Sequence, residues 1–312
     1  MLRILARQTR LSFESGAEHL YSHSGYVLLS IVVQRATKRT LDDFARERIF
    51  TPLGMRHTRF QHDHAALIPG RANGYVQRGG AWRIANSPLD VVGDGGLYST
   101  VDDMLRWAPA FERPEFAPLL SRMQTPGTLT DGRTIPSGYG MGLSRGMHRG
   151  VETVIHGGSL VGYRTGFMRV PSEQLTIIVL CNTATANAGR FAQLIVEAYA
   201  GDRFTTPPPA PANPSPAPPT PADAVTPDVG RALEGVYFSA ELDATYRIAV
   251  DRSSVVIEVG SRPPVPLELV APDRFRFPPV GAVLAPVRDA SGRVTGLTLT
   301  AGRVRDIVFV RR

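Results

Sequence analysis

Two short segments carry side chains that could take part in catalysis. The first, Tyr21-Ser-His-Ser-Gly-Tyr26, precedes an apolar stretch with helical spacing, so the Tyr21 hydroxyl can face a cleft and exchange protons with a substrate. The second is His156-Gly-Gly-Ser159, at the end of a predicted strand, where two glycines would let a substrate carbonyl approach the backbone. Each segment also has a structural interpretation, as a packing tyrosine with a satisfied hydroxyl and as a tight hairpin with an incidental histidine. The two segments become informative only together.

A third segment, Gly142-Leu-Ser-Arg-Gly146, fits the Gly-x-Ser-x-Gly pattern of a nucleophilic serine. That chemistry requires a strained turn from a strand into a helix. Ser144 is instead followed by Met-His-Arg-Gly150 and a predicted strand, which indicates a hairpin. We therefore do not expect Ser144 to be a nucleophile.

Metal and cofactor sites are not predicted. His62 and His64 are close in sequence, but Asp63 is their only nearby acid and His57 stands apart, which favours a solvated polar loop. The chain also lacks a Gly-x-Gly-x-x-Gly segment before a helix that could hold a phosphate, and Gly93-Asp-Gly-Gly96 is better explained as a backbone turn.

The elements that must position these residues follow from apolar spacing. Apolar residues recur every three or four positions over about 25–39, and again after Thr40, after Thr100 and over about 191–199. Thr40 and Thr100 are predicted to cap their helices, because an acidic residue follows each of them three positions later. In the last helix one face carries Phe191, Leu194, Ile195, Ala198 and Tyr199.

Three strands are predicted at 151–155, 163–170 and 174–181, joined by short turns. Connections this short favour an antiparallel meander, and the amphipathic helix that follows suggests a helix laid across one sheet face. The predicted fold class is α+β, an antiparallel sheet flanked by helices, followed by a small all-β, barrel-like domain.

A proline-rich segment separates these two parts. We predict a first domain over residues 1–204, a linker over 205–228 and a small all-β domain over 229–312. The last domain is inferred from short alternating segments such as Thr245–Val250 and Ser254–Val259, which turn signals separate.

Composition excludes several function classes. The net charge is +7, but the basic residues are scattered, so nucleic-acid binding is not expected. No apolar run approaches the roughly 20 residues of a membrane span, and the arginine-containing residues 1–10 do not resemble a secretory signal. Cys181 is the single cysteine, so an intramolecular disulfide is impossible, and no feature indicates an oligomeric state.

Five motifs, in order along the chain, together resemble the serine β-lactamase and penicillin-binding-protein superfamily, especially class C enzymes, D,D-peptidases and related esterases. The resemblance covers about Leu11 to Asn182, and Tyr237–Arg312 resembles the small β-barrel domain that often follows. The motifs are Tyr21–Leu29, Ile49-Phe-Thr-Pro-Leu-Gly-Met55, Gly93-Asp-Gly-Gly-Leu-Tyr-Ser-Thr100, Tyr139-Gly-Met-Gly142 and His156-Gly-Gly158.

The resemblance implies a role for each matching position. Tyr21 would act as base toward the serine and then as acid toward the leaving group, and the Ser159 backbone N–H would donate to the oxyanion. His156, with Gly157 and Gly158, matches the triad on the edge strand of the sheet and would lie near the tyrosine or the substrate. His23 stands where many relatives have a substrate-binding asparagine, which weakens a specific expectation of β-lactam substrates.

The nucleophile of the superfamily is missing from this sequence. It lies in a Ser-x-x-Lys pattern upstream of the tyrosine, but the only lysine here is Lys38, and Arg35 precedes it by three positions. The expected function is acyl transfer on a small-molecule or peptide substrate (β-lactam, D-amino peptide or ester), with this chain inactive as it stands. The alternative is a non-catalytic protein that binds a cell-wall peptide or a protein partner. Relatives that act on cell-wall substrates work in the periplasm or outside the cell.

Overall fold

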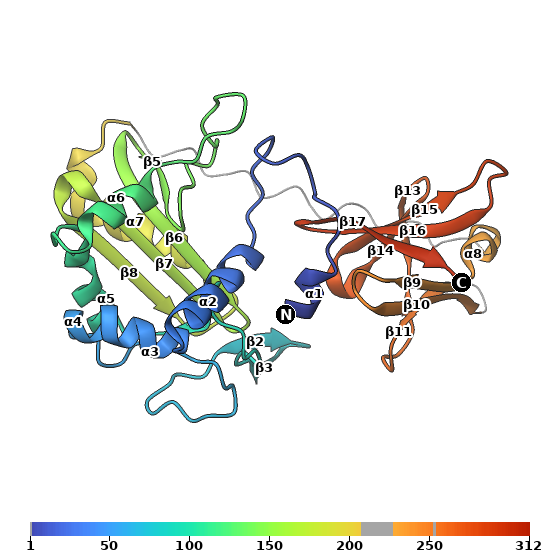
Figure 1. The fold of residues 1–312 in the computed structure, drawn as a ribbon, viewed down its shortest axis with the longest axis horizontal. Coiled ribbons are helices and arrows are strands. Elements are labelled where there is room, and N and C mark those ends of the chain that lie inside the picture. The colour runs from blue at the N-terminus through green and yellow to red at the C-terminus, as the bar shows by residue number, and fades with distance from the viewer. Residues whose placement is uncertain (1, 207–226, 252–253) are drawn as a thin grey trace. The chain divides into compact units, whose positions relative to one another are not determined.

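A computed structural model describes residues 2–206, 227–251 and 254–312 (Figure 1). The chain divides into two compact units: an α+β unit, residues 23–209, and a β unit that combines residues 1–22 with 210–312. Most of the predicted linker, 207–226, lies outside the described residues, and the predicted domain boundaries stay predictions.

Helices of the α+β unit begin near the predicted positions. Helix α2 begins one residue before the predicted start, and the helix after Thr40 continues through a π turn, Arg46–Phe50. None of the described helices is both long and apolar enough to cross a membrane. The helices are α2 (Ser24–Thr37), α3 (Leu41–Ala45), α4 (Thr51–Leu53), α5 (Val101–Trp107), α6 (Ala117–Gln124) and α7 (Ala188–Ala200).

Both predicted threonine caps are confirmed. The Thr40 hydroxyl accepts a hydrogen bond from the Asp43 backbone N–H at 3.0 Å, and Thr100 accepts one from Asp103 at 3.2 Å. Each bond satisfies one of the N–H groups that the first turn of a helix leaves without a partner. The buried Asp103 carboxylate also holds a distant loop, because its Oδ2 accepts from the His57 backbone N–H at 2.6 Å and from the Thr58 hydroxyl at 2.8 Å.

Replacing Asp103 with alanine is expected to destabilise the chain by about 3 kcal/mol, because two donors in a buried place lose their acceptor. The free energy of unfolding, measured by urea denaturation, tests this. Asp102→Ala is the matched control, since Asp102 is exposed in the same helical turn and its loss is expected to cost less than about 0.5 kcal/mol. Equal destabilisation by the two variants would contradict the role given to Asp103.

The sheet of the α+β unit is the predicted antiparallel meander with one additional strand. The order is β5-β6-β7-β8, and each strand pairs antiparallel with the next. The strands are β5 (Ser144–His148), β6 (Val151–Leu160), β7 (Tyr163–Val170) and β8 (Leu175–Cys181). One expectation is corrected: His156–Ser159 does not end a strand, because β6 continues through it to Leu160.

Successive residues of β7 divide the apolar core between the two sheet faces. Phe167 packs with the cluster that includes Phe50, Phe111 and Val154, whereas Met168 packs with Ala192 of α7 and its neighbours. This alternation follows from the two-residue period of a strand. One face therefore supports the helices α3–α6, and the other supports α7.

Helix α7 lies on the sheet as predicted, but not through its large side chains. Its buried residues are Ala188, Ala192, Val196 and Ala200, whereas Phe191, Leu194, Ile195 and Tyr199 are exposed. The helix approaches β7 so closely that a Cβ at Gly166 would lie 2.7 Å from the Ala188 carbonyl oxygen. Small residues form the contact because only they allow such an approach.

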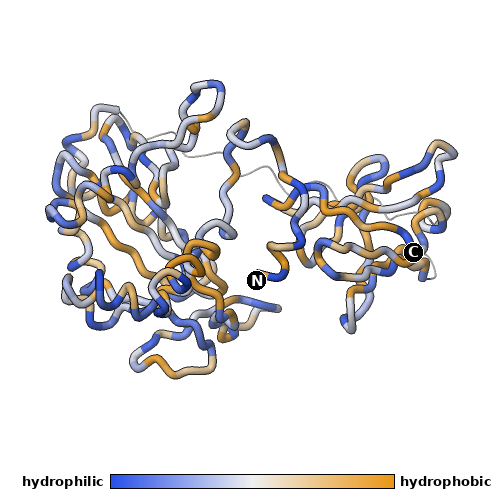
Figure 2. Tube along the Cα trace, viewed as in Figure 1, coloured by the Kyte–Doolittle hydropathy of each residue, from blue (hydrophilic) through white to orange (hydrophobic). Residues whose placement is uncertain are grey.

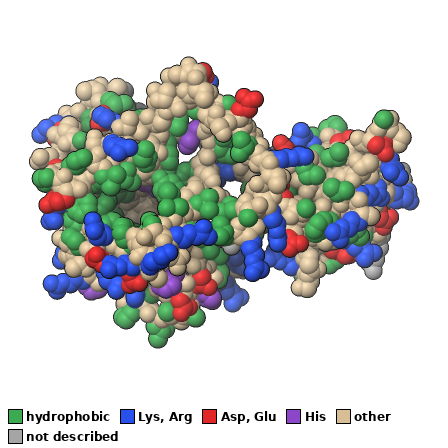
Figure 3. Space-filling view, viewed as in Figure 1, with side chains coloured by type: hydrophobic (Ala, Val, Ile, Leu, Met, Phe, Trp, Pro, Cys, Tyr) green, Lys and Arg blue, Asp and Glu red, His purple; other side chains and the backbone are tan. Residues whose placement is uncertain are grey.

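Exposed apolar side chains are also found on helix α2. Leu28, Leu29 and Val32 are 39%, 55% and 57% exposed, and Figure 2 shows this helix as a hydrophobic stretch. In Figure 3 hydrophobic side chains gather on one face of the α+β unit around a hollowed area. Apolar surface gathered in this way is typical of a binding site.

Two short strand pairs complete the α+β unit. Strand β1 (Arg59–Phe60) pairs with β4 (Leu97–Tyr98), and β2 (Tyr75–Arg78) forms a hairpin with β3 (Ala81–Ile84). The Tyr75 backbone N–H donates to the Asn182 carbonyl oxygen at 2.9 Å, which ties this hairpin to the segment after β8.

The β unit is a nine-stranded antiparallel sheet in the order β12-β11-β10-β9-β17-β16-β15-β14-β13. Its edge strands β12 and β13 are separated in sequence by Leu267 alone, so the sheet must curl until it is nearly closed, which confirms the barrel-like prediction. The buried side chains inside include Tyr237, Phe275 and Phe309. The strands are β9 (Gly235–Ser239), β10 (Ala244–Asp251), β11 (Ser254–Val259), β12 (Val265–Pro266), β13 (Glu268–Ala271), β14 (Arg274–Phe277), β15 (Ala282–Arg288), β16 (Val294–Ala301) and β17 (Val304–Arg311), with the helices α1 (Leu2–Ala6) and α8 (Pro227–Leu233).

Candidate active site

His156 lies on the sheet face that packs against helices α3–α6. It pairs across the strands with Phe167, and cross-strand partners share a sheet face, so His156 lies on the same side as the cluster around Phe111. The His156 side chain is held at both nitrogens. Its Nδ1 is 2.7 Å from the Gly157 carbonyl oxygen, and its Nε2 is 3.3 Å from the Tyr139 hydroxyl.

These two contacts define the tautomer of a neutral His156. A carbonyl oxygen can only accept a hydrogen bond. Nδ1 therefore carries the proton and donates a hydrogen bond to the Gly157 carbonyl oxygen. Nε2 then presents its lone pair and accepts from the Tyr139 hydroxyl. Tyr139 matched a sequence motif without a role attached to it, and the structure identifies it as a partner of the candidate histidine.

The strand that carries His156 is open on one side. Strand β5 pairs with β6 only as far as Ile155, so among the described strands none pairs with residues 156–160 on that side. Gly157, Gly158 and Ser159 are all exposed there. At Gly158 a Cβ would overlap the Thr165 hydroxyl, so a larger residue here would have to displace the Thr165 side chain. The exposed backbone is suited to hydrogen bonds with an extended substrate or with a carbonyl oxygen.

His23 is the residue before α2, and its side chain contacts a residue to which the sequence motifs gave no role. Its Nδ1 lies 2.9 Å from Oδ2 of Asp94, within the predicted turn Gly93–Gly96. Gly93 has φ +119°, and a Cβ there would lie 2.5 Å from the Tyr26 carbonyl oxygen, so the turn packs directly against the start of α2. This contact sets the position of His23.

Tyr21 belongs to the β unit, where an arginine holds it. The Arg303 guanidinium lies 4.7 Å from the centre of the Tyr21 ring and donates to the Tyr21 carbonyl oxygen at 3.2 Å. This geometry is a cation–π contact. His156 belongs to the other unit, so the predicted cooperation of Tyr21 with His156 stays a prediction.

The far end of the β6–β7 hairpin is fixed by Tyr163. Its hydroxyl lies 2.8 Å from both the Ala72 carbonyl oxygen and Oδ1 of Asn86, and burial raises the pKa of this tyrosine. Tyr163 therefore anchors the hairpin to the segments around β2 and β3. Ser144 begins β5 and pairs with Ile155, so the strand-to-helix turn of a serine nucleophile is not formed there.

Comparison with known proteins places this arrangement in a family. The family described as Beta-lactamase matches residues 1–202, about two thirds of the chain, and the chain belongs to this family. It is therefore a member of the serine β-lactamase and penicillin-binding-protein-like superfamily, as the motifs indicated.

Relatives found by sequence similarity include D-aminopeptidases. The protein from Gluconobacter oxydans (strain 621H) is 31% identical over 216 residues, which are 67% of this chain and 40% of the relative. The protein from Brucella anthropi is 29% identical over 184 residues, covering 57% of this chain and 34% of the relative. The chain thus spans about two fifths or less of the length of these two relatives.

Solved structures agree on the fold. The octameric penicillin-binding protein homologue from Pyrococcus abyssi is 21% identical, with a TM-score of 0.53, and the match covers 94% of this chain and 65% of that one. A D-stereospecific amidohydrolase from Streptomyces sp. is 22% identical, with a TM-score of 0.51, over 61% of this chain and 57% of its own. At these identities the likeness establishes the fold alone.

Proposed function

We propose that this chain supplies the substrate-binding strand and the proton-transferring tyrosine of a serine hydrolase that cleaves amide bonds next to a D-amino acid. The observation that carries the proposal is the open stretch of β6, where an oriented His156 stands beside the exposed backbone of Gly157–Ser159. Family membership supports acyl transfer as the reaction, and the D-aminopeptidase relatives support the substrate class.

Each residue has a defined part in this proposal. The substrate lies along the open side of β6, and the Ser159 backbone N–H donates to the oxygen that becomes negative when the carbonyl is attacked. His156, held as the Nδ1–H tautomer by Gly157 and Tyr139, contacts the substrate. Tyr21 moves the proton between the attacking hydroxyl and the leaving amine. His23, turned toward Asp94, lines the substrate site with Gly157 and Gly158.

The attacking hydroxyl has no source within this sequence, because no Ser-x-x-Lys occurs in it. We infer that the chain as it stands binds the substrate without turning it over. Reading the DNA upstream of the Met1 codon in the same frame tests the relation to an active enzyme. An in-frame Ser-x-x-Lys would supply the nucleophile that the proposal requires.

A second candidate function is non-catalytic binding of a cell-wall peptide or a protein partner. The exposed apolar side chains of α2 and α7 favour it, because such surface is usually covered by a partner. An upstream stop codon or unrelated upstream sequence would favour non-catalytic binding over the serine hydrolase function.

Binding of D-alaninamide to the full chain, followed by saturation-transfer NMR, tests the assigned site. We expect His156→Ala to weaken binding at least about tenfold, because the side chain that borders the open strand is removed. His57→Ala is the control, because His57 is exposed and has no part in the proposed site. An unchanged affinity in His156→Ala would refute the site, and tighter binding of a peptide ending in D-Ala-D-Ala would favour the second function.

A further inference from the structure

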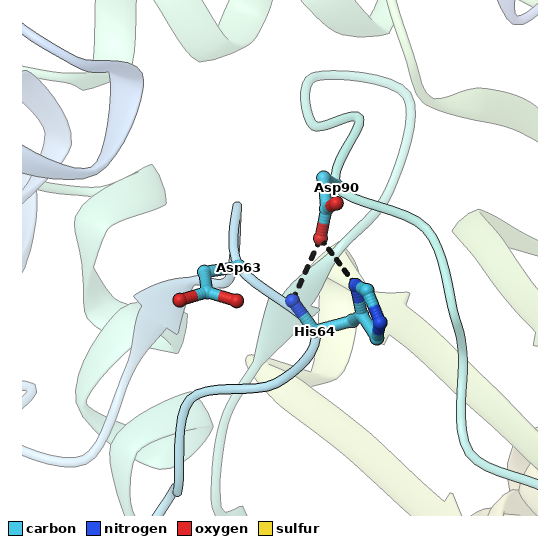
Figure 4. A group of neighbouring side chains, drawn as sticks. All are labelled: Asp63, His64 and Asp90. Carbon is cyan, nitrogen blue, oxygen red and sulfur yellow. Dashed lines mark hydrogen bonds and ion pairs between the residues drawn. The ribbon is translucent and has the colours of Figure 1, made fainter.

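Two loops of the α+β unit bring together three side chains that the proposed active site does not use. Asp63 and His64 follow β1, and Asp90 precedes β4, the partner strand of β1 (Figure 4). One potential ligand atom from each of the three residues lies within 4.8 Å of the others, and all three residues are exposed. These three side chains therefore form a candidate metal site.

The His64–Asp90 contact is a hydrogen bond whose length is close to the spacing of two ligands on one cation. Nδ1 of His64 is 2.9 Å from Oδ1 of Asp90. Two ligand atoms that each lie about 2.1 Å from a metal ion are roughly 3.0–3.4 Å apart, depending on the coordination geometry. A cation could therefore replace the shared proton with little movement of either side chain. One potential ligand atom of Asp63 lies within 4.8 Å of those of His64 and Asp90, so this exposed side chain would have to rotate to join the ion.

The loops are held in place before any ion binds. The Gln61 backbone N–H donates to the Gly96 carbonyl oxygen at 2.8 Å, and its buried side chain donates to the Asp63 carbonyl oxygen. The His64 backbone N–H donates to Asp90 Oδ1 at 2.7 Å, and the Ala65 N–H donates to Asp63 Oδ1 at 3.0 Å. Ligands placed by an existing scaffold lose less entropy when they bind.

Charge favours a cation at this place. Asp63 and Asp90 supply two carboxylates, and Nδ1 of His64 lies beside Oδ1 of Asp90. Among the described residues, the other carboxylate oxygens of Asp63 and Asp90 accept no hydrogen bond from another residue, so each can turn toward an ion.

We propose that Asp63, His64 and Asp90 form a binding site for a divalent transition-metal ion, with Zn²⁺ as the best fit. One imidazole and two carboxylates are a mixed nitrogen and oxygen set, which suits zinc and its neighbours better than Mg²⁺ or Ca²⁺. Three protein ligands leave a position for water.

The bound ion would hold in place the 90–96 turn, which leads to the candidate active site. Asp90 lies four residues before Asp94, whose carboxylate contacts Nδ1 of His23. An ion that joins Asp90 to the loop after β1 would therefore restrict both ends of the 90–96 turn, since Gly96 is already bonded to Gln61. The role is structural and involves no chemical step at the metal.

Titration of Zn²⁺ into the untagged full chain by isothermal titration calorimetry tests the site, with Mg²⁺ as the comparison cation. We expect one Zn²⁺ per chain and an affinity at least about tenfold lower in Asp90→Asn and in His64→Gln. Asp131→Asn and His57→Gln are matched controls, because each removes an exposed side chain of the same type elsewhere, and both should bind as the original does.

Two outcomes overturn the proposal: no zinc binding by the original chain, or binding that Asp90→Asn and His64→Gln leave unchanged. Circular dichroism of each variant shows whether it folds, and Asp63→Asn provides a third test if either of the first two does not. The readout is metal binding, so it is independent of whether the chain binds or hydrolyses a D-amino acid amide.

Discussion

The purified chain is expected to hydrolyse D-alanine p-nitroanilide at a rate about a millionfold below that of a complete serine hydrolase of comparable mechanism. The physical reason is the missing nucleophile: the sequence contains no Ser-x-x-Lys, and Ser144 begins a hairpin strand. Without an attacking hydroxyl, only substrate binding and the oxyanion donor can contribute. Release of p-nitroaniline, followed by absorbance, measures the rate.

The full-length D-aminopeptidase of Gluconobacter oxydans is the positive control for this assay, because it is the 31% identical relative. Turnover by the original chain within about a hundredfold of that enzyme would contradict the prediction. If His156→Ala then abolished the activity, some other residue near the open strand would have to act as nucleophile.

Gly138→Ala is expected to lower the free energy of unfolding by about 3 kcal/mol or more, the largest effect that we expect from adding a single methyl group. Gly138 has φ +64°, and a Cβ there would overlap the Arg145 carbonyl oxygen. The backbone conformation alone costs a non-glycine residue on the order of 1–3 kcal/mol, and the collision adds to it. Urea denaturation of the two proteins measures the difference.

Gly132→Ala separates the cost of the backbone conformation from the cost of the collision with the Arg145 carbonyl oxygen. Gly132 lies in the same loop with φ +85°, but a Cβ there would meet no atom within 4 Å, so only the backbone cost of about 1 kcal/mol is expected. A similar decrease in the free energy of unfolding in both variants would show that the collision with the Arg145 carbonyl oxygen contributes little. Because Tyr139 follows Gly138, the Gly138 variant should also weaken D-alaninamide binding by displacing the partner of His156.

Much of the fold could be predicted because the signals are local. The threonine caps depend on residues three positions apart, and the meander depends on alternating apolar residues with turns between them. The packing of α7 was less predictable. A hydrophobic pattern favours the large residues Phe191 and Leu194 as the buried face, yet the close approach to Gly166 selects the face with Ala188 and Ala192.

The candidate site was also predictable in part. His156-Gly-Gly158 could be selected only together with Tyr21 and the other motifs that resemble the superfamily, and the structure then showed that β5 stops before it. The partnership of Tyr139 with His156, and that of His23 with Asp94, join residues 17 and 71 positions apart. The sequence alone gives no reason to expect either contact.

Residue types at fixed short spacings were enough to establish the family, the α+β and barrel-like architecture, and the absence of a Ser-x-x-Lys pattern. Which side chains meet could be learned only from the folded chain. His62 and His64 read as a solvated pair with Asp63 as the only nearby acid, until the pairing of β1 with β4 brought Asp90 to His64. The physical reason is that a contact between distant residues depends on the path of the backbone between them, and strand pairing sets that path.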